Sequence, residues 1–197
     1  MSSKGIIVVG TNRPKSRSLA ISQIIKNIYK KINVNFEILE LSKLDFSHLN
    51  GTQYSDNQPQ DIKNAIDKIS QARSLVMVVP EYNGGIPGVL KYFIDHWKYP
   101  DCFEYRPVSF VGLGGRFGGL RPVEHLQQVF GYRNSYIFPE RVFLCNVWNV
   151  LKDQTLTDPV AIELLEKQAL LFNKFIEALE SSQLDANSFN TIKNLEA

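Results

Sequence analysis

The sequence predicts a three-layer α/β sandwich built on a five-stranded parallel sheet. Five short apolar segments, rich in β-branched residues and typical of strands buried on both faces, lie along the chain. They alternate with five segments in which apolar residues recur at helical spacing. Such alternation implies parallel pairing through right-handed crossovers, with helices on both faces of the sheet. The strand order expected for a doubly wound sheet of this size is 2-1-3-4-5.

The first half of the chain supplies three strands and two helices. Strands are expected at residues 5–9, 36–41 and 75–79, and amphipathic helices at residues 19–32 and 61–73. The polar stretch 42–60 contains Asn50-Gly51 and Pro59, which break regular structure, so it is expected to be a long loop.

The second half continues the pattern. A third helix is expected to begin at Pro87, where a missing N–H does no harm, and to extend to Trp97. The next elements are expected to be a strand at 108–113, a helix at 123–130, a strand at 141–147 and a helix from Pro159 to Leu179, with Asp158 as its N-cap. The chain is expected to be one domain, 1–197, with a core of about residues 4–180 and a polar tail at 181–197.

The composition of the chain indicates which kinds of partner, and which cellular compartment, are to be expected. A formal net charge of +2 gives no reason to expect a nucleic acid or a membrane surface as partner. No apolar run reaches the ~18 residues of a membrane helix, and the start of the chain has no signal-peptide pattern. Cys102 and Cys145 form no CxxC and are expected to be reduced, so the cytoplasm is the expected location.

Ligands of doubly wound sheets bind beyond the carboxyl ends of the strands, next to the switch point. The loop after the first strand reads GTNRPKSRS, residues 10–18, and ends at a helix. Its hydroxyls, the Arg13 guanidinium and the free N–H groups of the helix start suit a phosphate. The loop lacks the Walker and GxGxxG patterns. The alternative is an N-cap serine in a polar loop whose basic residues are solvated.

The loop after the third strand reads PEYNGGIPG, residues 80–88. Gly84 and Gly85 have no Cβ, so their backbone can approach a flat ligand and direct N–H groups at its ring. The alternative is a glycine turn that only leads into the helix that begins at Pro87.

These segments resemble a known family. PEYNGGIPGVLKYFIDHW, residues 80–97, is similar to the PEYNxSxPGxLKNxIDW signature of NADPH-dependent FMN reductases, flavodoxin-like proteins that include quinone, azo and chromate reductases. GTNRPKSRS resembles their GSxRxxSxN phosphate loop. Residues 112–129, which contain GGRFGG, resemble their third loop.

The resemblance implies an FMN site made from these three loops. The phosphate would be held by Thr11, Arg13, Ser16 and Ser18, the isoalloxazine lined by Pro80, Glu81, Tyr82, Asn83, Gly84, Gly85 and Ile86, and its far side closed by Gly114, Gly115, Arg116 and Phe117. Three of these positions depart from the family pattern. Thr11 replaces a serine, Ser18 an asparagine and Gly85 a common serine.

The resemblance also implies NADPH or NADH as electron donor and a small acceptor: a flavin, a quinone, an azo compound or a metal oxyanion. Hydride transfer belongs to the cofactors, so no catalytic side chain is assigned. No metal site is expected, because His48, His96 and His125 lack ligand spacing. A homodimer or homotetramer is implied. The aromatic residues Tyr92, Trp97, Tyr99, Phe103 and Tyr105 are either part of that interface or partly core.

Two other functions remain open at this point. A flavodoxin-like electron carrier would bind FMN without using NAD(P)H, but such carriers usually present a strongly acidic surface, which a net charge of +2 does not favour. A phosphoacceptor signalling domain would need an acidic pair after the first strand and an aspartate at the end of the third. This chain has Gly10-Thr11 and Pro80-Glu81 there.

Overall fold

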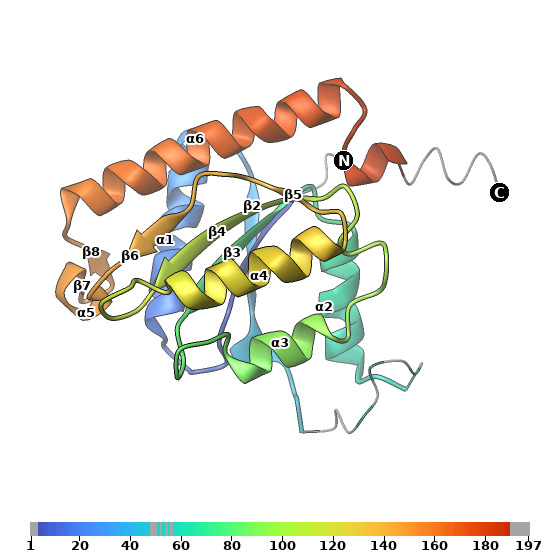
Figure 1. The fold of residues 1–197 in the computed structure, drawn as a ribbon, viewed down its shortest axis with the longest axis horizontal. Coiled ribbons are helices and arrows are strands. Elements are labelled where there is room, and N and C mark those ends of the chain that lie inside the picture. Colours follow the sequence, from blue (N-terminus) through green and yellow to red (C-terminus); the bar gives the residue numbers. More distant parts are fainter. Residues whose placement is uncertain (1–3, 48–50, 52, 54, 56, 190–197) are drawn as a thin grey trace.

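The central sheet has the order β2-β1-β3-β4-β5 with every pairing parallel, which confirms the predicted fold class (Figure 1). The structure is a computed structural model that describes residues 4–47, 51, 53, 55 and 57–189. Its strands are β1 Gly5–Val9, β2 Phe36–Glu40, β3 Leu75–Pro80, β4 Pro107–Leu113, β5 Tyr136–Ile137 and β6 Val142–Leu144. β1 lies between β2 and β3, so the chain changes direction beside β1 and β3.

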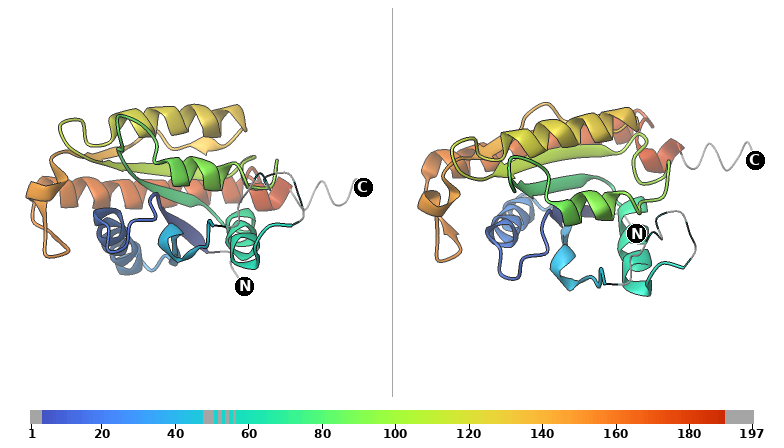
Figure 2. Two further views of the ribbon diagram at one scale, coloured as in Figure 1. Left: turned by 90° about the horizontal axis from the view of Figure 1, so that it is seen from below. Right: turned by 60° about the horizontal axis from the view of Figure 1, so that its bottom comes forward.

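Helices cover both faces of this sheet (Figure 2). One apolar cluster joins the sheet to α1 and α6, and a second joins the opposite face to α2, α3 and α4. Neighbouring residues of β1 show the division, since Ile7 belongs to the first cluster and Val8 to the second. The helices are α1 Arg17–Lys31, α2 Gln60–Ser70, α3 Gly88–Ile94, α4 Leu120–Tyr132 and α6 Pro159–Ser181.

The edge of the sheet beside β4 differs from the prediction of one strand at 141–147. Two short strands, β5 and β6, pair with β4 in succession, and Pro139, which has no N–H to donate, lies between them. Residues 145–147 are not strand. A short helix, α5 Val147–Val150, and a hairpin of β7 Leu151–Lys152 and β8 Thr155–Leu156 follow β6, and neither was predicted.

The stretch between β2 and α2 begins with a 3-10 turn, η1 Leu41–Lys43. Residues 48–50, 52, 54 and 56 of the expected loop, including His48, lie outside the described residues.

The prediction of a polar tail from residue 181 is wrong for its first part. Asp185 and Ala186 are buried, and the Phe189 ring stacks on Tyr105 with centroids 4.0 Å apart. Residues 190–197 are not described.

Candidate active site

A cavity of about 500 Å³ lies at the carboxyl ends of the strands. Its lining comes from four segments: 13–20 after β1, 80–82 after β3, 113–115 at the end of β4, and 147–154 after β6. The three loops expected to meet do contribute to one cavity. The fourth segment was not predicted.

One end of the cavity is the start of α1. Ser16 is the N-cap, and its Oγ accepts a hydrogen bond of 3.1 Å from the Leu19 N–H. The alternative of a capping serine is therefore correct for Ser16, although its hydroxyl proton is still available to a ligand. Arg17 and Ser18 are the first residues of the helix, where no preceding turn can accept from their N–H groups. This end thus presents donors and the positive end of a helix dipole.

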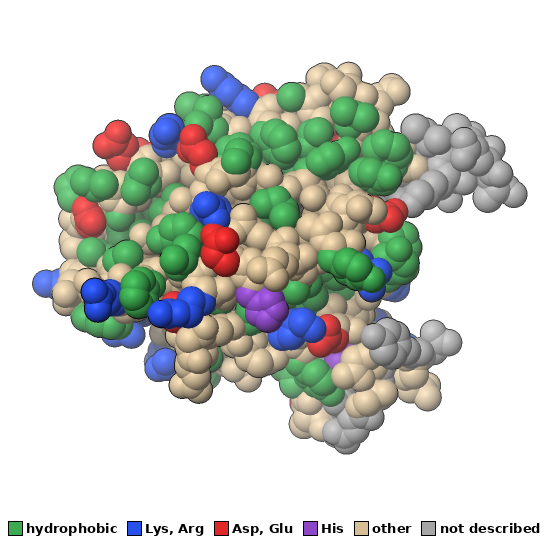
Figure 3. All heavy atoms as spheres, in the orientation of Figure 1, with side chains coloured by type: hydrophobic (Ala, Val, Ile, Leu, Met, Phe, Trp, Pro, Cys, Tyr) green, Lys and Arg blue, Asp and Glu red, His purple; other side chains and the backbone are tan. Residues whose placement is uncertain are grey.

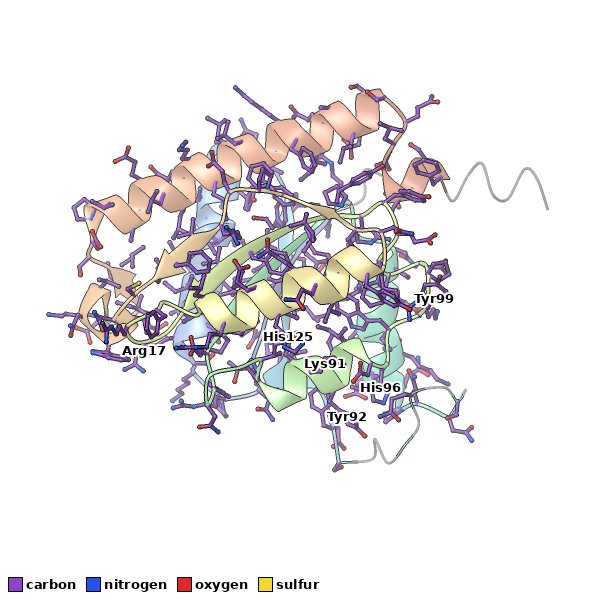
Figure 4. All side chains as sticks on the ribbon, viewed as in Figure 1. Arg17, Lys91, Tyr92, His96, Tyr99 and His125 are labelled. Atoms are coloured by element: carbon purple, nitrogen blue, oxygen red, sulfur yellow. The ribbon has the colours of Figure 1, made fainter. Side chains whose placement is uncertain are left out.

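Among the described residues, the basic side chains at this end of the cavity form no ion pair. Arg13, Lys15 and Arg17 line the cavity, and none of the ion pairs among the described residues involves them. Figure 3 shows Lys and Arg side chains gathered at the end of the molecule where Figure 4 labels Arg17. An anion bound here would meet uncompensated positive charge.

Thr11 lies behind the cavity. It is buried, it is not part of the lining, and its hydroxyl is hydrogen-bonded to the Tyr82 phenol. Ser18 is also buried but does line the cavity. Of the four residues expected to hold a phosphate, the structure brings Arg13, Ser16 and Ser18 to one surface and places Thr11 where it supports that surface.

The glycines after β3 form a turn. Tyr82 and Gly85 exchange two backbone hydrogen bonds of 3.1 and 3.0 Å, and Asn83 and Gly84 between them have φ values of 50° and 78°. Positive φ at both central residues is typical of a type I′ turn, for which Asn-Gly is the favoured pair. The Gly85 N–H is donated within the turn, contrary to the expectation that it faces a ring.

The second loop therefore divides at Tyr82. Pro80, Glu81 and Tyr82 line the cavity. The remaining residues that were expected to line a ring, Asn83, Gly84, Gly85 and Ile86, lie outside the lining.

The third loop divides in the same way. Gly114 and Gly115 line the cavity, whereas Arg116 and Phe117 are exposed and do not. The Arg121 guanidinium lies 4.4 Å from the centroid of the Phe117 ring and pairs with Glu81 at 2.6 Å. Glu81 and Arg121 thus fasten the second loop to the start of α4.

The fourth segment adds the residues that the sequence analysis missed. Val147, Trp148, Leu151, Asp153 and Gln154 line the cavity. The carboxyl-end rule applies to every strand of the sheet, so a large aromatic residue soon after the last strand was the available signal.

The cavity fits a phosphorylated flat ring such as FMN. Its α1 end offers hydroxyls, backbone N–H groups and cations, while Pro80, Tyr82, Leu113, Val147, Trp148 and Leu151 give the rest an apolar and aromatic lining. Its volume lies in the ~300–1,000 Å³ range of small-molecule and cofactor sites. Gly114 and Gly115 keep the wall close to the backbone.

Sheet order and cavity together define a flavodoxin-like α/β protein. Among the solved structures that share this fold are two oxidoreductases. The flavoenzyme NAD(P)H:(acceptor) oxidoreductase FerB from Paracoccus denitrificans has a TM-score of 0.72 at 19% identity, covering 90% of this chain and 98% of that chain. The NADH:FMN oxidoreductase EMOB in its apo form has a TM-score of 0.72 at 14% identity, covering 87% and 88%.

The chain belongs to the NADPH-dependent FMN reductase family, whose profile matches residues 4–149. The FMN-dependent NADPH-azoreductase of Staphylococcus aureus (strain USA300) is 30% identical over 132 residues, covering 64% of this chain and 68% of that protein. The resemblance found in the three loops is thereby confirmed. The protein is an FMN-dependent NAD(P)H oxidoreductase, and the electron-carrier alternative is not favoured.

Proposed function

We propose that this chain acts as a single FMN-binding domain, with the FMN phosphate at the start of α1 and the isoalloxazine toward Tyr82 and Trp148. The observation that carries this proposal is that one cavity is lined by the donors and cations of the loop after β1 and by apolar and aromatic residues from the other three segments. Arg13, Ser16, Ser18 and the first N–H groups of α1 are assigned to the phosphate. Pro80, Glu81, Tyr82, Gly114 and Gly115 are assigned to the ring.

When bound, FMN supplies hydride and electron transfer between NAD(P)H and an acceptor. The chain's own residues bind and orient the ring. The Glu81–Arg121 ion pair and the hydrogen-bonded turn after Tyr82 hold the second loop in place. The apolar lining limits the access of water to the ring. Because these tasks require no proton donor or base, the proposal includes no catalytic side chain.

The acceptor is proposed to be a small molecule, with quinones and azo compounds first among the candidates. The azoreductase of Staphylococcus aureus supports an azo acceptor and NADPH as donor. The lining of the cavity includes three cations, Arg13, Lys15 and Arg17, which exceed what one phosphate needs and suit an anionic nucleotide as a second ligand.

The decisive experiment is spectroscopic. The purified protein, loaded with FMN, should show flavin absorption that bleaches when NADPH or NADH is added without oxygen, and that returns when a quinone or azo compound follows. Flavin that stays oxidised in the presence of both nucleotides would overturn the enzymatic function. Bleaching without reoxidation by either acceptor would overturn the acceptor assignment.

A homodimer or homotetramer is proposed through the face formed by α3 and α4. A groove of about 400 Å³ lies there, and Figure 4 shows Lys91 and His125 between these helices. The exposed rings of Tyr99 and Tyr132 both lie close to Arg133. Trp97 and Phe103, by contrast, belong to the core. A monomeric mass by light scattering would exclude this assembly.

Among the described residues, no helix is long and apolar enough to cross a bilayer. The proposal of a cytoplasmic location is based on the cysteines, because Cys102 and Cys145 are both free, as is usual for proteins of a reducing compartment. Fractionation of cells that express the chain would test it.

A further inference from the structure

The fourth segment of the lining, residues 147–154, forms one wall of the cavity and is hydrogen-bonded through the residues around its start to the glycine loop after β4. It is called the fourth wall below. The Gly114 N–H donates to Leu144 O at 3.2 Å, the Asn146 N–H to Gly115 O at 2.8 Å, and the Val147 N–H to Gly114 O at 3.0 Å. Three backbone hydrogen bonds join these two short segments. They fix the segment that carries α5 relative to the loop that the family resemblance assigns to the flavin.

Trp148 is the large aromatic residue of this wall. The residue is 51% exposed although it lines the cavity, so much of its surface has no protein partner among the described residues. One edge lies against the backbone of Gly115, where an added Cβ would lie 3.1 Å from Trp148 Cη2. The absence of a side chain at position 115 lets the indole approach the glycine loop this closely.

The distribution of charge decides which part of a ligand meets the indole. The unpaired cations of the cavity, Arg13, Lys15 and Arg17, come from the loop after β1. Trp148 shares its wall with Val147 and Leu151, both apolar, and with the carboxylate of Asp153, which repels a phosphate. An uncharged flat ring is therefore the group that suits this side.

Val147 and Trp148 lie within the part of the chain that matches the family, and Leu151, Asp153 and Gln154 lie outside it. The family match ends at residue 149, whereas the wall continues through the β7–β8 hairpin to Gln154. Phe117, which the family resemblance assigned to the ring, does not line the cavity.

We propose that Trp148 binds the flat ring of the cofactor by stacking its indole on the isoalloxazine. This inference depends on the proposed function, because it assumes that FMN occupies the cavity. It assigns to a residue after β6 an aromatic contact with the ring, whereas the family resemblance placed Phe117 at the far side of the ring. Offset stacking of two aromatic systems stabilises their contact by about 0.5–1.5 kcal/mol beyond the burial of area.

The test compares Trp148→Leu with Trp148→Phe, and uses the apoprotein with FMN and with riboflavin. W148L should weaken the binding of both ligands about two- to twelvefold, the loss that corresponds to a stacking contact. Bound flavin should also become more fluorescent in W148L, because an indole in contact with an excited flavin quenches its emission. W148F, which keeps an aromatic ring, should restore most of the affinity.

Phe117→Leu is the contrasting variant, since Phe117 is an exposed aromatic residue of the neighbouring loop. Equal riboflavin affinity and equal flavin emission in W148L and the wild type would overturn the stacking contact while the FMN function stands. A larger loss in F117L than in W148L would also overturn it. A wild-type chain that binds neither ligand would overturn both the contact and the proposed function.

Discussion

The hydroxyl oxygens of Thr11 and Tyr82 lie 2.7 Å apart, so that a hydrogen bond joins the loop after β1 to the loop after β3. The Arg13 N–H also donates to Thr11 Oγ1, at 3.3 Å. Thr11 is buried and outside the cavity lining, yet it contacts a residue of the cationic end and a residue of the aromatic end. Its geometry is that of a positioning residue between the two parts of the site.

Replacement of Thr11 by valine should therefore weaken FMN binding without removing any group that faces the cavity. The expected loss is about two- to twelvefold in the dissociation constant, the equivalent of ~0.5–1.5 kcal/mol for one hydrogen bond. Thr11→Ser keeps the hydroxyl and is the matched control. In a double-mutant cycle, T11V and Y82F should be clearly non-additive. Additive losses would show that the two hydroxyls do not act together.

If Arg13 contacts the FMN phosphate, its replacement should weaken the binding of FMN but not of a flavin without a phosphate. Arg13→Ala should raise the dissociation constant of FMN about ten- to hundredfold, because hydrogen bonds to charged groups contribute ~1.5–3 kcal/mol. Riboflavin has no phosphate and should bind wild type and R13A equally. Arg133→Ala removes the same charge from the groove between α3 and α4 and should leave both affinities unchanged. A parallel loss of riboflavin binding in R13A would contradict a phosphate contact.

The sequence predicted the meeting of three loops because that follows from strand order alone. Parallel strands end at one edge, and the polar and glycine-rich loops after β1, β3 and β4 had recognisable patterns. It did not predict which residues of each loop face inward. Asn83 and Gly84 form a tight turn with two positive φ values, and this turn directs residues 83–86 away from the cavity.

The fourth wall was missed for a different reason. β7 and β8 contain two residues each, and Asp153 and Gln154 between them have φ values of 47° and 62°. Two-residue strands are too short to show an alternating pattern. Asp-Gln is also not a pair that commonly marks a turn of positive φ.

Besides Pro139, a long-range contact accompanies the interruption between β5 and β6. The side-chain amide of Gln168 in α6 donates to Phe110 O at 3.0 Å and to Glu140 O at 2.9 Å. The amide thus binds a carbonyl of β4 beside the interruption. Gln168 and Asn173 are the two polar side chains among the buried residues of α6, and neither shows in the sequence which backbone group it contacts.

Gln168→Leu should consequently destabilise the fold by about 1–3 kcal/mol, because the buried Phe110 carbonyl would lose this partner. Urea denaturation monitored by circular dichroism measures the difference. Gln23→Leu, at an exposed position of α1, is the matched control and should stay within about 0.5 kcal/mol of the wild type. A Q168L chain as stable as the wild type would show that the amide contributes nothing net.

The buried thiol of Cys102 leads us to expect that the free energy of unfolding falls at alkaline pH. Burial raises the pKa of its thiol from 9.0 to about 12. Between these values the folded chain keeps a proton that the unfolded chain loses, so the stabilisation present below about pH 9 is lost as the pH rises toward 12. From about pH 8 to pH 10 the wild type should lose ~1.4 kcal/mol more than Cys102→Ala, since one pH unit above the unfolded pKa corresponds to that amount.

The interval from pH 8 to pH 10 is chosen because the neighbouring residue Arg106 changes its ionisation mainly above it. Burial lowers the pKa of the Arg106 guanidinium to about 10. Above that value the unfolded chain binds the additional proton, so the Arg106 contribution rises with pH and opposes the loss at Cys102. Urea titrations under reducing conditions between pH 8 and pH 10 therefore report mainly on Cys102, because Arg106 begins to lose its proton only at the upper end of this interval. Cys145→Ala, which alters an exposed thiol, should reproduce the wild-type slope, and a C102A slope equal to it would show that the thiol of Cys102 ionises in the folded chain.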